Sequence, residues 1–77
     1  MILVNNSNRE SKWTVTPTGA PPLGGIFKAG QYHRIDNPPG YPPYTVGFTC
    51  SGIEGVQSKD AVVTFDTGKP AQASYPD

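Results

Sequence analysis

Residues with nucleophilic or basic side chains are few and scattered in this sequence. His33 is the only histidine and Cys50 the only cysteine. A serine, threonine or cysteine nucleophile needs an adjacent base, and Asp36, three residues after His33, would lie on the opposite face of a strand. Cys50 follows Val46 and Phe48 with a period of two, so we expect it to be an inert core side chain. We therefore predict that the protein is not an enzyme.

The acidic residues do not form a recognisable metal site. No two potential ligands have a spacing that is diagnostic of a zinc or EF-hand site. Asp60 and Asp66 flank one predicted strand, and at about 3.3 Å per residue they are about 20 Å apart. Glycosidases need two facing carboxylates in a cleft, for which a chain of 77 residues has little room. We predict no metal, no cofactor and no catalytic residues.

The most distinctive segment is residues 37–44, which read Asn-Pro-Pro-Gly-Tyr-Pro-Pro-Tyr. Each proline fixes φ near about −65°, so this segment has little conformational freedom to lose on binding. Tyrosine combines apolar area with a hydrogen-bonding hydroxyl and is frequent in binding surfaces. We predict a rigid recognition loop that presents Tyr41 and Tyr44. A plain connector between strands and a polyproline ligand for another protein's aromatic groove are the alternatives.

The uncharged polar composition favours carbohydrate as the ligand. The sequence combines zero net charge with frequent asparagine and glutamine. A sugar ring stacks its C–H groups on an aromatic face, while amides bind its hydroxyls. We therefore predict a non-catalytic, lectin-like module. Trp13 alternates with Val15, which favours a core position for its ring; exposure would instead strengthen the carbohydrate interpretation. The candidate ligand-binding residues are Tyr32, Asn37, Tyr41, Tyr44 and Trp13.

Two other functions remain open, and two classes of partner are disfavoured. A protein-interaction module or inhibitor would insert the rigid 37–44 loop into a partner, because preordering lowers the cost of binding. A structural subunit would polymerise through open sheet edges. Basic residues are scattered and matched by as many acidic ones, so we predict no nucleic-acid partner. No apolar run approaches the roughly 18 residues of a membrane span.

Small size predicts self-association. A domain of this length hides only about 60% of the surface that its unfolded chain exposes, and one cysteine cannot form an internal disulfide. We expect a homo-oligomer. Met1–Val4 is too short an apolar run for a secretory signal and gives way to polar Asn5. The chain is therefore expected to be intracellular or a processed mature form, with its compartment unassigned.

The elements that must position these residues are short strands. Nine prolines and nine glycines leave little room for helices, and apolar residues alternate with a period of two. In the best example, Tyr44, Val46 and Phe48 share one face and Thr45 the other. The ranges expected as strands are Ile2–Asn5, Lys12–Thr16, Gly25–Lys28, Gln31–Asp36, Tyr44–Cys50, Ala61–Asp66 and Ala71–Tyr75.

This pattern predicts an all-β fold in a single domain, residues 1–77. About six to seven short strands with turn residues between them are typical of a small antiparallel β-sandwich or barrel. The spacing resembles immunoglobulin-like sandwiches in pattern only, because the paired cysteines of that family are missing. The core side chains that we predict are Val4, Trp13, Val15, Ile26, Ile35, Val46, Phe48, Cys50, Val63 and Phe65.

Overall fold

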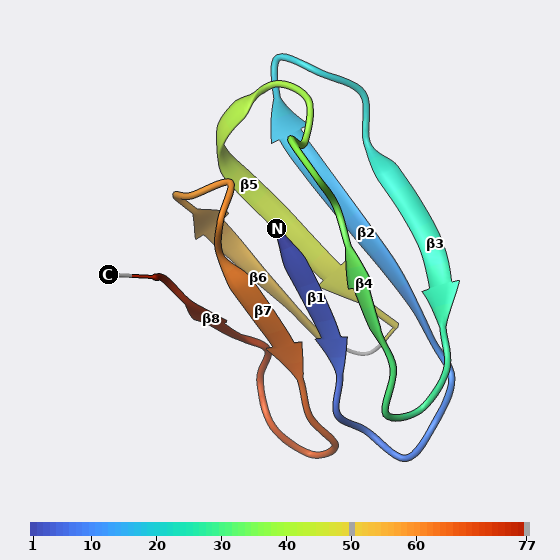
Figure 1. Ribbon diagram of the computed structural model, residues 1–77. Helices are drawn as coiled ribbons and strands as arrows, with labels where there is room; N and C mark the ends of the chain where they lie inside the picture. Colours follow the sequence, from blue (N-terminus) through green and yellow to red (C-terminus); the bar gives the residue numbers. More distant parts are fainter. Residues whose placement is uncertain (50, 77) are drawn as a thin grey trace.

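The computed structural model describes residues 1–49 and 51–76 (Figure 1). All regular structure in this part of the chain is β, and no described segment forms a helix able to cross a membrane. The strands are β1 (Ile2–Asn5), β2 (Ser11–Thr18), β3 (Leu23–Phe27), β4 (Tyr32–Arg34), β5 (Tyr41–Phe48), β6 (Ser51–Val56), β7 (Val62–Phe65) and β8 (Gln72–Ser74).

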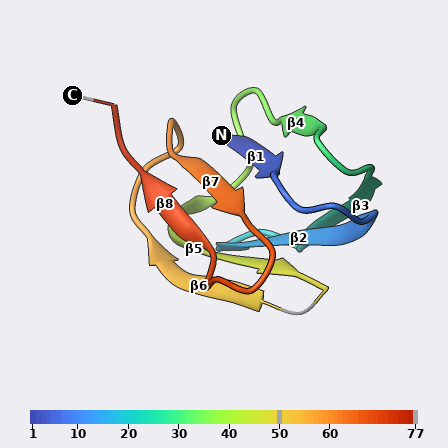
Figure 2. The ribbon, with the colours of Figure 1, turned by 90° about the horizontal axis from the view of Figure 1, so that it is seen from below.

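The strands form two sheets of four, in the orders β4-β1-β7-β8 and β3-β2-β5-β6. Seen from below in Figure 2, the sheets lie as two layers, and neither closes on itself. Neighbouring strands are antiparallel except β1 and β7, which run parallel. The prediction of a small β-sandwich is confirmed, and the barrel alternative is not.

Alternating burial in the two central strands confirms the period-two pattern. In β2, Trp13 and Val15 are buried while Thr14 and Thr16 are exposed. In β5, Tyr44, Val46 and Phe48 are buried. These two strands pair directly, with Val15 opposite Val46, so their inward side chains form the centre of the core. Cys50, also expected there, lies outside the described residues.

Strand β6 was not predicted from the sequence. It contains Gly52, Glu54 and Gly55, and both glycine and glutamate are depleted in strands. Pairing with β5 holds this strand in the sheet, from Tyr44 opposite Val56 to Phe48 opposite Ser51. The register shifts near Gly55, whose φ is 76°. Val56 from this strand is fully buried. Tertiary pairing has therefore overridden a weak local preference.

The core differs from the prediction at two positions. Ile26 is 61% exposed, because β3 turns Gly25 and Phe27 inward instead. A Cβ on Gly25 would lie 2.9 Å from the Trp13 ring, so this glycine leaves the space that the indole fills. Val4 lies only half-buried on the outer face of its sheet, since Leu3 takes the inward position.

The other core predictions are confirmed in full or in part. Trp13, Val15, Val46, Phe48 and Val63 are buried, and Ile35 and Phe65 pack against the core while partly exposed. Several other buried side chains were not predicted as core from the sequence pattern, namely Met1, Leu3, Phe27, Tyr44, Val56, Ala61 and Ala71.

Candidate functional site

Two of the predicted ligand-binding residues are buried. Tyr44 is 0% exposed, so the prediction that it presents a free ring is wrong. Its position in phase with Val46 places it in the core, where burial raises the pKa of its hydroxyl. Trp13 is 5% exposed, with its indole stacked on the His33 imidazole at a centroid distance of 4.6 Å. The core interpretation of Trp13 is therefore correct, and its role as an exposed contact is not.

The three remaining predicted residues are exposed but do not converge. Tyr32 is 69% exposed beside Val4 on the outer face of the β4-β1-β7-β8 sheet. Tyr41 is 58% exposed in the other sheet, opposite Thr18. Asn37 is exposed between β4 and β5, with φ at 51°. No single surface brings these side chains together.

The predicted recognition loop is largely built into the fold. β5 begins at Tyr41 rather than Tyr44, so half of residues 37–44 is strand. Pro38 is fully buried, and Thr18 Oγ1 donates a hydrogen bond to the Pro43 carbonyl at 2.9 Å. The exposed remainder consists of Asn37, Pro39, Tyr41 and Pro43.

The largest of three hollows on the described surface lies elsewhere, at the end of the sandwich where the β1–β2 and β7–β8 loops lie (Figure 1). This groove has a volume of about 750 Å³. A large concave site with a few polar groups is the default place to look for ligand binding. Its lining comes from residues 7–11 of the β1–β2 loop and β2, from Thr49 and Ser51, and from residues 65 and 67–70.

One fully buried side chain holds the β1–β2 loop in place. Asn5 Nδ2 lies within hydrogen-bond distance of the carbonyl oxygens of Arg9, Phe27 and Lys28, at 2.8, 3.3 and 3.2 Å. Its Oδ1 accepts hydrogen bonds from the backbone N–H and the hydroxyl of Ser7. A buried amide with both ends satisfied stabilises this polar loop. The groove wall formed by residues 7–10 is thus preorganised.

Hydroxyl groups fix the rest of the groove wall. Ser11 Oγ and Thr49 Oγ1 lie 3.1 Å apart and join the start of β2 to the end of β5. Thr49 Oγ1 also accepts the Lys12 backbone N–H at 3.0 Å. Ser51 Oγ accepts the backbone N–H of Ala71 at 3.0 Å and so ties the β7–β8 loop to β6.

An aromatic ladder leads from the core to the groove. Phe27 stacks on Phe48 at a centroid distance of 5.7 Å, and Phe48 stacks on Phe65 at 5.1 Å. Phe65 lines the groove and is partly exposed. Phe48 covers one face of the Phe65 ring, and Phe65 also contributes to the groove lining. Phe65 therefore joins the core to the candidate site.

The charges at the groove are carried by Arg9, Glu10 and Lys69, all exposed. Lys69 Nζ lies 3.8 Å from the Asp66 carboxylate, a surface ion pair that contributes little to stability. Over the described residues, no group of three potential metal ligands occurs. The groove can offer a flat apolar surface, hydroxyls, an amide and a few mobile charges to a ligand.

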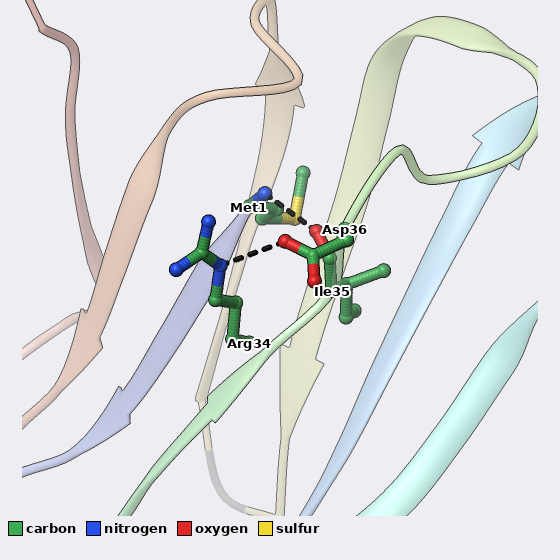
Figure 3. Close-up of polar contacts among 4 residues, drawn as sticks. All are labelled: Met1, Arg34, Ile35 and Asp36. Atoms are coloured by element: carbon green, nitrogen blue, oxygen red, sulfur yellow. Dashed lines mark hydrogen bonds and ion pairs between the residues drawn. The ribbon is translucent and has the colours of Figure 1, made fainter.

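Two smaller hollows flank the segment Arg34–Asp36. One, of about 480 Å³, contains Asn37; the other, of about 490 Å³, contains Trp13 and His33. Arg34 Nε donates to Asp36 Oδ1 at 2.7 Å, and the Met1 amino nitrogen donates to the Ile35 carbonyl at 2.9 Å (Figure 3). Both hollows are smaller than the groove.

The sequence contained one signal for the groove that the prediction did not use. Asn5 stands in phase with Leu3, at an inward position of a strand, and a polar residue there must find partners within the protein. Phe65 was predicted only as a core residue, and its second role depends on where the β7–β8 loop turns away.

Comparisons with known protein families, with curated proteins and with solved structures find no match to this chain.

Proposed function

We propose that the protein is a non-catalytic carbohydrate-binding module whose ligand lies in the groove between the β1–β2 and β7–β8 loops. The observation that carries this proposal is the partly exposed Phe65 ring, stacked on Phe48 and bordered by hydroxyl-bearing residues. Sugar rings are bound by one aromatic face together with hydrogen-bonding groups at the ring edge. The function predicted from composition is retained, and its site is moved from the tyrosines to this groove.

Uncommitted polar groups support the proposal. Within the described part of the chain, no hydrogen bond engages the Asn8 amide or the Thr67 hydroxyl, and both line the groove. The side chains of Arg9 and Glu10 are also without an ion pair among these residues. These groups supply both donors and acceptors, as hydroxyl recognition requires.

The composition of the groove favours binding over hydrolysis. Glu10 is the only carboxylate among the described residues that line it, whereas glycoside hydrolysis uses two facing carboxyl groups. His33 lines a different hollow, beside Trp13. A general acid–base pair is therefore not assembled from the groove's described side chains.

The proposal is tested by titrating isotope-labelled protein with a panel of neutral and acidic oligosaccharides and following its amide resonances. We expect shifts at Asn8, Ser51 and Thr67 that saturate with one ligand. Phe65→Leu, which removes the aromatic face but keeps an apolar side chain, should weaken binding about threefold to tenfold. Asn8→Ala should weaken it about threefold to tenfold.

Tyr32→Ala is the matched control, since it removes an exposed aromatic ring that does not line the groove. It should leave the affinity within about twofold. An oligosaccharide panel without saturable shifts would refute carbohydrate binding. Saturable shifts that centre on Tyr32 or Tyr41, and that Phe65→Leu leaves unchanged, would refute the groove as the site.

A further inference from the structure

One face of the sandwich has no cover in the described structure, namely the outer face of the β3-β2-β5-β6 sheet, the lower layer in Figure 2. Alternation along β2 and β5 turns Thr14, Thr16 and Thr45 outward, and all three are exposed. Thr16 lies directly opposite Thr45, so the middle of the face carries hydroxyl and methyl groups without charge. Ile26, which is 61% exposed, adds an apolar side chain on β3. We call this surface the threonine face.

A row of small residues crosses the threonine face. The register places side by side, one from each strand in the order β3, β2, β5 and β6, the residues Gly24, Thr14, Gly47 and Gly52. Thr14 is the one member of the row with a side chain, and its Oγ1 lies 2.7 Å from the position that a Cβ on Gly47 would occupy. Glycine lets another backbone approach closely. The middle of the face can therefore come into close contact with a second flat surface.

Two charged side chains of the threonine face lie on opposite sides of this row. β2 and β6 run in the same direction, because each is antiparallel to β5. Lys12 comes two residues before the row on β2, whereas Glu54 comes two residues after it on β6. Both are exposed, and neither has an ion pair among the described residues. Gly47, in the strand between them, is therefore near the midpoint of the line that joins Lys12 to Glu54.

This placement makes the threonine face complementary to a second copy of itself. A two-fold axis lying in the plane of contact relates two such faces, and each contact in the interface then occurs twice. When the axis passes through Gly47 at right angles to the line from Lys12 to Glu54, each Lys12 lies over the partner's Glu54. The same axis brings the two Gly47 backbones together, where no side chain keeps them apart. Opposite charges that align in this way favour a second copy of the chain over an unrelated protein.

The dimensions of the molecule allow an interface of ordinary size on this face. The sandwich measures 32 × 27 × 19 Å along its principal axes, and its two layers are stacked along the short direction with about 10 Å between the sheets. The broad side is then comparable with the roughly 800 Å² that each partner contributes to a standard interface. A domain of this length also hides only about 60% of its unfolded surface when it folds alone. Association at this face adds burial that the single chain lacks.

We propose that the threonine face is the interface of a two-fold symmetric homodimer, with the two chains in close contact at Gly47 and two ion pairs that each join Lys12 to the partner's Glu54. The ion pairs fix the relative orientation of the two sheets, and burial of threonine methyl groups and Ile26 holds the faces together. The dimer does not depend on carbohydrate binding, because Phe65 of the groove belongs to the other sheet.

Sedimentation of the wild-type protein from about 1 μM to about 1 mM is the first test. We expect a reversible monomer–dimer equilibrium within this range, with a dissociation constant that rises with salt concentration because charge pairing contributes to binding. Amide resonances that shift with protein concentration should centre on Thr14, Thr45 and Gly47. A monomer over the whole range would overturn the proposal, as would concentration-dependent shifts that centre on Val4 and Tyr32 in the other sheet.

Charge reversal tests the pairing itself. Lys12→Glu and Glu54→Lys should each weaken the dimer about tenfold or more, because each places like charges opposite one another in both pairs. An equimolar mixture of the two variants restores opposite charges, and its heterodimer should match the wild-type affinity within about threefold. Lys59→Glu, a charge reversal in the β6–β7 loop, is the matched control and should change the affinity less than about twofold. A mixture that fails to associate, or an equal loss with Lys59→Glu, would contradict this interface.

Discussion

The two ends of the sandwich are stiffened in different ways. At one end, the polar β1–β2 loop is held by the side chain of Asn5, which is 0% exposed and hydrogen-bonded at both its amide nitrogen and oxygen. At the opposite end, residues 37–44 are held by prolines and by packing (Figure 1). Tyr44 closes this segment and is equally buried, but its hydroxyl has no partner in the described structure.

The comparison shows that a rigid segment is not thereby a binding segment. Proline restricts the backbone without needing a hydrogen-bond partner. A proline-rich segment can therefore be rigid and still pack against the core, and within residues 37–44 both Pro38 and Tyr44 are buried. A polar loop becomes ordered only where something buried satisfies its carbonyls. In the β1–β2 loop, the buried Asn5 meets that requirement, and residues 7–10 of this loop line the groove.

The largest effect is expected for Asn5→Ala. This substitution removes the amide donor to the Arg9, Phe27 and Lys28 carbonyls and the acceptor of both Ser7 hydrogen bonds. The free energy of unfolding should fall by about 3 to 4 kcal/mol, although the Ser7 hydroxyl still donates to Arg9 and the Gln31 N–H to Lys28. Asn6→Ala, at an exposed neighbouring position, should change it by less than about 0.5 kcal/mol. Urea denaturation measures both, and equal effects would show that Asn5 does not organise this end.

A glycine pair tests the packing at the other end. Gly40 has φ at 70°, and a Cβ there would meet the Thr18 carbonyl oxygen, so Gly40→Ala should cost about 2 to 3 kcal/mol. Gly30 has φ at 75° with open space around it. Gly30→Ala should cost only about 1 kcal/mol, the backbone strain alone. If the two variants unfold at the same urea concentration, the segment is not packed closely at Gly40.

Tyr44→Phe should stabilise the protein. It removes a buried hydroxyl that has no partner and keeps the ring, so the free energy of unfolding should rise by about 1 kcal/mol. Tyr41→Phe removes an exposed hydroxyl and should have an effect below about 0.5 kcal/mol. Loss of stability in Tyr44→Phe would mean that the hydroxyl has a hydrogen-bond partner after all.

The smallest effect concerns alkaline pH. Burial raises the pKa of Tyr44 above its ordinary value of about 10. Above that ordinary value the unfolded chain releases the proton while the folded chain retains it, so stability falls as pH rises. Tyr44→Phe lacks this contribution and should lose less stability between about pH 9 and about pH 11. Urea denaturation at several pH values measures this. If the wild-type protein and Tyr44→Phe lose the same amount of stability over this range, the raised pKa of Tyr44 is contradicted.

Local pattern alone was enough to predict the class of fold. Prolines and glycines exclude helices, and alternation in β2 and β5 correctly places Trp13, Val15, Val46 and Phe48 inward. The same pattern misplaced Ile26, because a one-residue choice of phase reverses every side chain of a strand. Only the pairing of Trp13 with Gly25 decides that phase.

Apart from the inward-facing Asn5, the candidate site could not be predicted from the sequence, for a different reason. Tyrosines and prolines drew attention to residues 37–44, yet convergence of side chains depends on which loops meet. Asn5 reaches carbonyls at residues 9, 27 and 28, and Phe65 reaches the groove through a stack that starts at Phe27.

By itself, the sequence determined that short pleated strands would form a small β domain, since backbone restriction and period-two burial are local properties. The tertiary structure decided which polar and aromatic side chains stay at the surface together. Long-range strand register makes that decision, because it sets which residues far apart in the chain share one end or one edge of the sandwich.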